Sequence, residues 1–165
     1  MKLTRLFRHL LLPAWFVRRG FSRGDLAAIG DAIAACEKLH RGELRFVVEG
    51  PLSLSALWRG MSSRARAVDV FSAQRVWDTA ENSGILIYVQ LVDRRVEILA
   101  DRGIAARVAQ AEWDAICRDM EANFRGGEWR RGALQAVARA GTLLASHFPA
   151  ASSNPNELPD QPLVI

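Results

Sequence analysis

Apolar residues recur along much of this chain every three or four positions, which is the spacing of one face of a helix. Four segments have this pattern: 25–39, 52–77, 110–124 and 129–148. Ser22 precedes the first segment and is an N-cap candidate, because a serine oxygen accepts hydrogen bonds from the free amides of a first helical turn. The second segment contains residues 60–63 (GMSS), where we expect it to divide into two helices.

Shorter segments predict strands. Residues 43–49 alternate apolar and polar side chains, whereas residues 84–92 are almost continuously apolar, as in a strand buried on both faces. Residues 96–100 follow an Asp-Arg turn and predict the edge member of a hairpin. A long helical crossover separates the first two strands, so they should be parallel, and the third should be antiparallel to the second. We therefore predict an α/β/α sandwich around a small mixed sheet of three strands, or four, in the order 1-2-3.

The chain has 165 residues, half of them hydrophobic, which is enough for one domain. We place this domain at residues 25–149. Residues 1–24 contain six basic residues and no acidic one, so the rest of the chain has a net charge of −2 against a total of +4. Residues 150–165 contain three of the six prolines and predict an extended tail.

The basic arm at residues 1–24 leaves two alternatives open. Five apolar residues recur at helical spacing between its basic residues: Leu3, Leu6, Phe7, Leu10 and Leu11. The arm is either an interfacial anchor on an anionic membrane surface or a helix that packs on the domain or on a protein partner.

Composition excludes several classes of protein. The two cysteines cannot make a disulfide framework, and the three histidines lie too far apart for a histidine-rich metal site. No stretch approaches the roughly 20 apolar residues that span a bilayer, and the apolar run 10–17 lacks the cleavage site of a signal peptide. Beyond residue 24 the arginines are mixed with acids, so we expect no nucleic-acid partner. We expect a cytoplasmic protein, or one peripheral to the inner membrane, and leave its oligomeric state open.

The predicted topology brings three polar segments to one edge of the sheet. They are His40 with Glu43, Asp78 with Glu81 and Asn82, and Asp101 with Arg102 and Gly103. Carboxylate and amide oxygens suit a hard cation such as Ca²⁺ or Mg²⁺. The candidate metal ligands are Asp78, Glu81, Asn82 and Asp101. The candidate ligand-binding residues are His40, Glu43, Asn82, Gly84, Arg102 and Gly103, since an arginine there would suit an anion. The alternative is that the Asp and Asn side chains only cap turns, because they readily bond their own backbone.

The run VWDTAENSGILIYVQLVDRRVEILADRGI at 76–104 resembles the signature of the TPM-domain family. HRGELRFVVE at 40–49, FRGG at 124–127 and the terminal FP and NELPD segments are similar to its short bacterial branch. The resemblance implies an α/β/α sandwich, and some relatives bind divalent cations, act as acid phosphatases or have membrane-linked roles. The residues that match the functional loops of the family are Asp78, Asn82, Gly84, Asp101 and Gly103. Unlike many relatives, this sequence shows neither an export signal nor a C-terminal membrane helix.

We therefore expect a non-catalytic accessory or binding module that takes a divalent cation, Ca²⁺ or Mg²⁺, or an anionic partner at residues 78–82 and 101–103. The alternative is a metal-assisted acid phosphatase with Asp78 and Asp101 as ligands or acid/base groups, an expectation that comes from the family resemblance. The binding module is favoured because no residue is visibly set up as a nucleophile beside a base.

Overall fold

The computed structural model describes residues 3–13, 17–151 and 155–165, and it confirms an α/β fold with a mixed sheet. In this part of the chain the sheet has four strands in the order β3-β2-β1-β4. They are β1 Leu44–Glu49, β2 Ile85–Gln90, β3 Arg95–Ala100 and β4 Leu163–Val164. As predicted, β1 and β2 are parallel and β2 and β3 antiparallel, with Phe46 opposite Ile87 and Ile87 opposite Ile98.

The predicted order 1-2-3 is that of β1, β2 and β3, and the fourth strand that the prediction allowed for comes from the tail. The end of the predicted extended tail returns to the sheet as β4, parallel to β1, with Val47 opposite Leu163. Two further main-chain hydrogen bonds hold it: Gly50 N donates to Ile165 O at 2.9 Å and Ile165 N to Val48 O at 3.0 Å. The edge of β1 is therefore covered, which removes an unpaired row of backbone groups.

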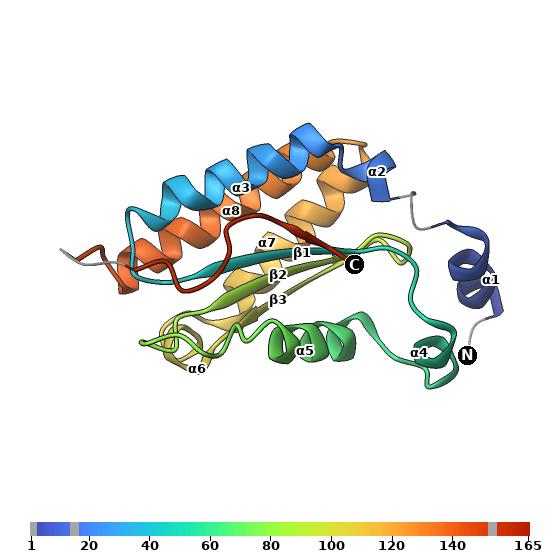
Figure 1. Ribbon diagram of the computed structural model, residues 1–165, viewed down its shortest axis with the longest axis horizontal. Coiled ribbons are helices and arrows are strands. Elements are labelled where there is room, and N and C mark those ends of the chain that lie inside the picture. The colour runs from blue at the N-terminus through green and yellow to red at the C-terminus, as the bar shows by residue number, and fades with distance from the viewer. Residues whose placement is uncertain (1–2, 14–16, 152–154) are drawn as a thin grey trace.

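Three long helices cover one face of the sheet (Figure 1): α3 Arg23–Glu37, α7 Gln110–Arg125 and α8 Trp129–His147. α3 begins with a capping box in which Ser22 and Asp25 satisfy each other's backbone amides, as its sequence indicates. The main core lies between these helices and the sheet and includes Phe46, Ile87 and Trp113. Phe21, inside the predicted arm, is fully buried there against Phe46 and Phe124.

The other face is covered by α5 Ser63–Ala73, which follows the short helix α4 Leu54–Trp58. Ala67 and Val70 of α5 pack with Leu86 and Tyr88, and Leu158 of the tail joins the same cluster. The predicted division of the 52–77 segment is confirmed, because Ser62 is the N-cap of α5 and accepts from Ala65 N at 3.1 Å.

The remaining helices lie at opposite ends of the molecule (Figure 1). α6 Arg102–Ala105 follows β3 near the starts of β1 and β2, whereas α1 Leu3–Leu11 and α2 Val17–Gly20 lie toward their carboxyl ends. α1 sits beside α4 and the β2–β3 turn, so the first half of the basic arm is docked on the domain.

Candidate functional site

Three loops meet where β1 and β2 begin and β3 ends: residues 40–43, 78–84 and 101–103, here called the loop edge. Asp101 N donates to Gly84 O at 2.8 Å, and Gly103 N donates to Asn82 O at 2.9 Å. These main-chain bonds place the third loop directly on the second. The Ser83 hydroxyl reaches Arg41 O at 3.4 Å and joins the first loop to them.

Close approach of the backbones explains the two glycines of the loop edge. A Cβ at Gly103 would lie 2.4 Å from Glu81 O, and one at Gly84 would lie 2.0 Å from Val76 O. Asn82 adopts the left-handed conformation with φ 53°, which asparagine tolerates better than most residues. Gly84 and Gly103, expected to bind ligand, are therefore needed for the fold of this edge.

His40 and Glu43, also expected at the site, point into the protein. His40 is fully buried and its Nδ1–H donates to Gly42 O at 2.9 Å, and burial lowers its pKa. Glu43 is 2% exposed and accepts from Leu158 N at 3.0 Å. Burial raises the pKa of Glu43 to about 7 against the opposing effect of its main-chain hydrogen bonds. Glu43 thus ties the tail to β1.

The exposed side chains of the loop edge pair with nearby arginines. Asp78 forms an ion pair with Arg75, and Glu81 forms one with Arg41. Asn82 Oδ1 accepts from Arg102 Nε at 2.9 Å. Within the described ranges, no three His, Cys, Asp or Glu side chains come together as a metal-binding group. The four predicted metal ligands therefore share an edge without forming such a group.

Asp101 differs from the other acids of the loop edge. Its Oδ1 accepts from Arg102 N at 2.7 Å and caps α6. Its Oδ2 is buried and has no hydrogen-bond partner in the described part of the chain. A buried carboxylate oxygen without a donor is costly, so a cation or a donor fits this position.

The opposite end of the sheet contains a pocket that our sequence reasoning missed, here called the α1–α5 pocket. It has a volume of about 630 Å³ and lies between α1, the first turn of α5, the β2–β3 turn and α7. Its wall includes Arg5, Arg8, Ser62, Ser63, Asp93 and Arg95. Two features of the sequence could have indicated this pocket. One is the pair Ser62-Ser63 at the start of a helix. The other is the four-residue spacing of Arg5 and His9, which puts both on one face of a helix and suits an acidic partner such as the turn residue Asp93.

Asp93 in the β2–β3 turn attaches α1 to the domain. Arg5 donates to it from Nε at 3.0 and 3.1 Å and from a terminal nitrogen at 2.7 Å. His9 Nδ1 accepts from Leu52 N at 2.9 Å, so its proton is on Nε2, which lies 3.2 Å from Asp93 Oδ1. Burial tends to raise the pKa of Asp93, but His9 and Arg5 outweigh it and hold the pKa at about 2.

Comparisons with known proteins agree with this architecture. The family model described as "TPM domain" matches residues 19–143, which is most of the chain. This chain belongs to the TPM-domain family. The BA42 protein of the psychrophilic bacterium Bizionia argentinensis, solved by NMR, is 29% identical with a TM-score of 0.76. The similarity covers 87% of this chain and 94% of BA42. A search of curated proteins finds no match.

The described helices of this TPM domain include none that is both long and apolar enough to cross a bilayer. α1 instead presents apolar residues to solvent on one side only. Leu3, Phe7, Leu10 and Leu11 are 57–77% exposed. On the inner side Arg5 and His9 bind Asp93, and Leu6 packs against the small cluster that contains Leu52 and Leu57.

Proposed function

We propose that this TPM domain is a non-catalytic binding module that docks peripherally on an anionic membrane surface through α1. One observation carries the proposal: α1 binds the domain with its polar side and leaves its apolar side in solvent. In a surface helix of a soluble domain the apolar side normally faces the core. A helix with the reverse orientation has its apolar side free to insert into the surface of a membrane.

The orientation of α1 follows from its contacts. Arg5 Nη1 donates to Met61 O at 2.8 Å while the same guanidinium binds Asp93. His9 bridges Asp93 and Leu52 N. Rotating α1 to bury Phe7 would break all of these bonds and leave Asp93 without its donors. The outward orientation of the apolar side is therefore held by polar contacts.

The surroundings of this apolar side support a lipid surface as the occupant. The neighbouring helix α4 adds Leu54 at 49% and Trp58 at 66% exposure. Tryptophan is enriched at membrane interfaces because its ring is amphipathic. Arg8, Arg18, Arg19 and Arg59 are exposed and basic, and residues 1–24 carry six basic residues and no acid. Each basic residue near an anionic surface contributes about 1 kcal/mol.

Vesicle flotation of the full chain tests this proposal. We expect it to float with phosphatidylcholine vesicles that contain phosphatidylglycerol, less well at high salt, and not with phosphatidylcholine alone. The double variant Phe7→Glu/Leu10→Glu should lose flotation. Leu39→Glu, at a side chain with 65% exposure elsewhere on the surface, is the matched control and should float like the parent. Flotation that survives the double variant, or no flotation on anionic vesicles, contradicts the proposal.

Binding of Ca²⁺ or Mg²⁺ at the loop edge is the second candidate function, and the unpartnered Oδ2 of Asp101 favours it. Asp101 would be the principal ligand, with Asn82 and Glu81 as neighbours. Calorimetric titration should give heat with the parent chain and none with Asp101→Asn. Asp78→Asn, which removes an exposed carboxylate paired with Arg75, is the control and should retain the heat. Absence of heat in the parent would exclude this candidate.

The phosphatase alternative makes a different prediction at the same loop edge. A metal-assisted hydrolase of phosphomonoesters should show turnover of p-nitrophenyl phosphate that requires the cation. That turnover should fall in Asp101→Asn, because Asp101 is the candidate ligand. Turnover that persists unchanged in the Asp78→Asn/Asp101→Asn double variant would assign the activity to a contaminant.

A further inference from the structure

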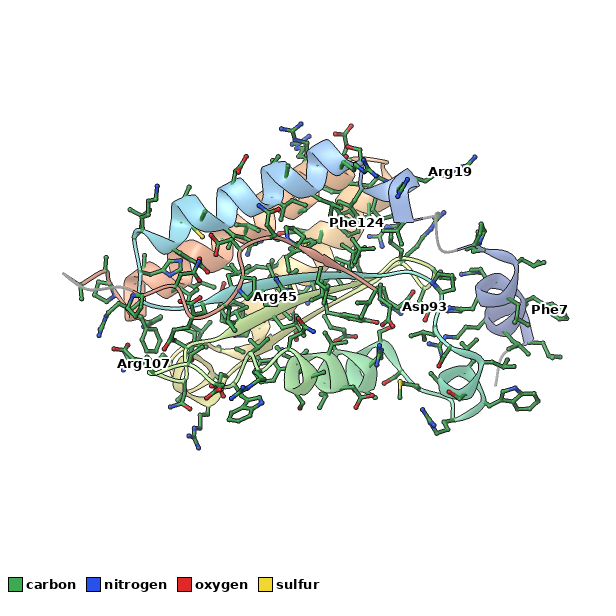
Figure 2. All side chains as sticks on the ribbon, viewed as in Figure 1. Phe7, Arg19, Arg45, Asp93, Arg107 and Phe124 are labelled. Atoms are coloured by element: carbon green, nitrogen blue, oxygen red, sulfur yellow. The ribbon has the colours of Figure 1, made fainter. Side chains whose placement is uncertain are left out.

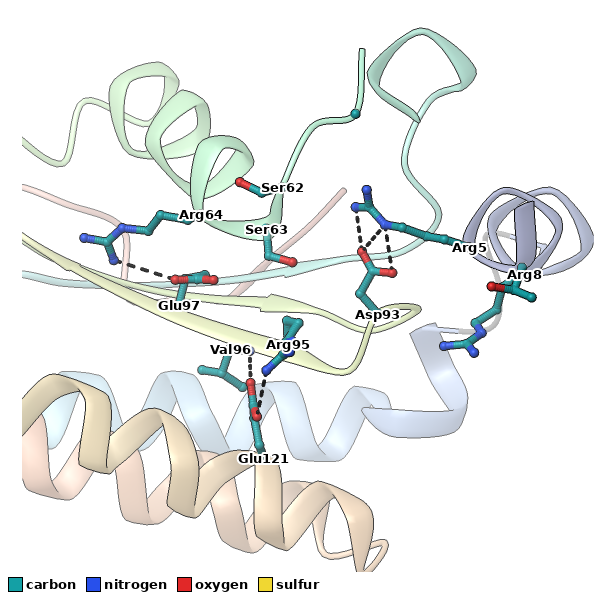
Figure 3. A pocket seen from close by; sticks show the side chains of 12 residues that line it. Arg5, Arg8, Ser62, Ser63, Arg64, Asp93, Arg95, Val96, Glu97 and Glu121 are labelled. Carbon is teal, nitrogen blue, oxygen red and sulfur yellow. Dashed lines mark hydrogen bonds and ion pairs between the residues drawn. The ribbon is translucent and has the colours of Figure 1, made fainter. Parts of the chain in front are cut away.

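The α1–α5 pocket has hydrogen-bond donors in its wall that have no acceptor among the residues that the structure describes. Ser63 is the clearest of them. The residue is 8% exposed, and its hydroxyl forms no hydrogen bond within the described part of the chain. Figure 3 shows this hydroxyl pointing into the pocket, on the side of the Arg5–Asp93 pair. The hydroxyl is not among the fully buried unpartnered polar atoms, so it is accessible from the pocket and free to donate to a ligand there.

The first turn of α5 adds main-chain donors beside this hydroxyl. Ser62 caps the helix and its side chain accepts from Ala65 N. The amides of Ser63 and Arg64 have no acceptor among the described residues. α5 has 11 residues, so its N-terminus carries the partial positive charge of a regular helix. Amides and a hydroxyl at such a position favour an anion.

The charged side chains of the pocket leave a positive excess. The wall contains four arginines and three acids: Arg5, Arg8, Arg64, Arg95, Asp93, Glu97 and Glu121. Each acid has an arginine within 4 Å, with distances of 2.7 Å for Arg5–Asp93, 3.7 Å for Arg64–Glu97 and 3.6 Å for Arg95–Glu121. Arg8 forms no ion pair or hydrogen bond in the described ranges and supplies the excess.

We propose that the α1–α5 pocket binds a phosphate group, which accepts from the Ser63 hydroxyl and the first amides of α5 and is neutralised by Arg8. Phosphate fits because every free group of the wall named above is a donor, and because guanidinium and helix N-termini both bind phosphate oxygens well. At about 630 Å³ the pocket also has room for the group that carries the phosphate. The source is either a soluble phosphate ester or the headgroup of a lipid.

Titration of the full chain with inorganic phosphate and with glycerol 3-phosphate, at constant ionic strength, tests the proposal. Heat and the amide NMR shifts of Ser63 and Arg64 should saturate together. Ser63→Ala should weaken binding about tenfold, as expected for the loss of one hydrogen bond to a charged group. Arg8→Gln should weaken phosphate binding about fivefold.

The controls test folding and the location of the site. Ser63→Ala removes an unpartnered hydroxyl, so it should fold like the parent. Ser72→Ala and Arg118→Gln are exposed controls outside the pocket and should bind like the parent.

Vesicles that contain phosphatidic acid separate the two sources. If glycerol 3-phosphate displaces the chain from them, the headgroup enters the pocket; if it binds without displacing the chain, the ligand is a soluble ester. Phe7→Ser/Leu10→Ser, which removes the apolar side chains without adding charge beside Arg8, should lose flotation and keep phosphate binding, so failure of membrane docking is distinguishable from failure of this proposal. No saturable binding of either phosphate, or equal affinity in Ser63→Ala, would overturn it.

Discussion

His9 Nε2 lies 3.2 Å from Asp93 Oδ1, although the two residues are 84 positions apart in the chain. This contact, with the Arg5–Asp93 ion pair, joins the first helix to the β2–β3 turn and closes one side of the α1–α5 pocket. Figure 2 shows Phe7 projecting outward from the same helix, away from Asp93. One acidic residue in a turn therefore determines both which side of α1 faces the domain and which side faces solvent.

Replacing Asp93 should release α1. Asp93→Asn removes the charge that Arg5 and His9 share, and we expect a local loss of about 2–3 kcal/mol because the pair is partly buried. Hydrogen exchange should show faster exchange in residues 3–11 and unchanged protection in β1 and β2. Asp78→Asn, at an exposed i,i+3 pair, is the control and should change stability by less than about 0.5 kcal/mol. Full protection of α1 in Asp93→Asn would show that apolar contacts alone hold it.

Stability should fall as pH rises through the range set by Glu43. Burial raises the pKa of this carboxyl from 4.5 to about 7, so the folded state holds a proton that the unfolded state releases near pH 4.5. The contribution of Glu43 to the free energy of unfolding is complete below pH 4.5 and is lost by about pH 7. The loss over this range is about 3 kcal/mol. Glu37, whose pKa burial raises to about 9, extends the decline to higher pH.

Denaturant unfolding at several pH values measures this effect. In Glu43→Gln the decline between pH 4.5 and 7 should be about half as steep as in the parent, because Glu37 alone then contributes to it, and the decline above pH 7 should be unchanged. Glu112→Gln, at an exposed position of α7, should retain the pH dependence of the parent. A Glu43→Gln variant with the full slope would assign the dependence to other groups.

The tail should be part of the folded domain rather than an appendage. Leu158 is 7% exposed in the cluster beneath α5, and Arg45 donates to Pro159 O and Gln161 O at 2.7 Å each. Leu158→Ala should therefore lower the free energy of unfolding by about 2–3 kcal/mol. Val164→Ala, at a residue with 42% exposure, should cost much less. Thermal unfolding of the two variants compares these costs directly, and equal small losses would show that the tail is not cooperatively folded.

Gly103→Ala should disturb the loop edge without touching any charged group. The added Cβ would lie 2.4 Å from Glu81 O and 2.6 Å from Asn82 O, both main-chain atoms that cannot rotate away. We expect a loss of about 1–3 kcal/mol, visible in the unfolding midpoint. At Gly24, on the surface of α3, the nearest atom to a new Cβ is 3.8 Å away. Gly24→Ala should therefore stabilise the chain by up to about 1 kcal/mol.

Local sequence patterns were sufficient for the sheet of three strands and for most helix boundaries. The apolar run before Asp93 predicted a central strand, and the helical crossover before it predicted that β1 and β2 are parallel, as they are. The same topology brought the loops at Asn82 and Gly103 to one edge. Ser22 marked the start of α3, because capping depends only on residues three positions apart, and residues 60–63 marked the division before α5.

Only the tertiary structure decided the features that depend on contacts between residues far apart in the sequence. A two-residue strand such as β4 has no periodicity of its own and forms because β1 presents an unpaired edge. Glu43 lies beside the polar loops in sequence, yet Leu158 N draws its side chain inward. The sequence pattern of α1 established that this helix has an apolar side and a polar side. Which side faces the domain depends on Asp93, whose position is known only once the sheet has formed.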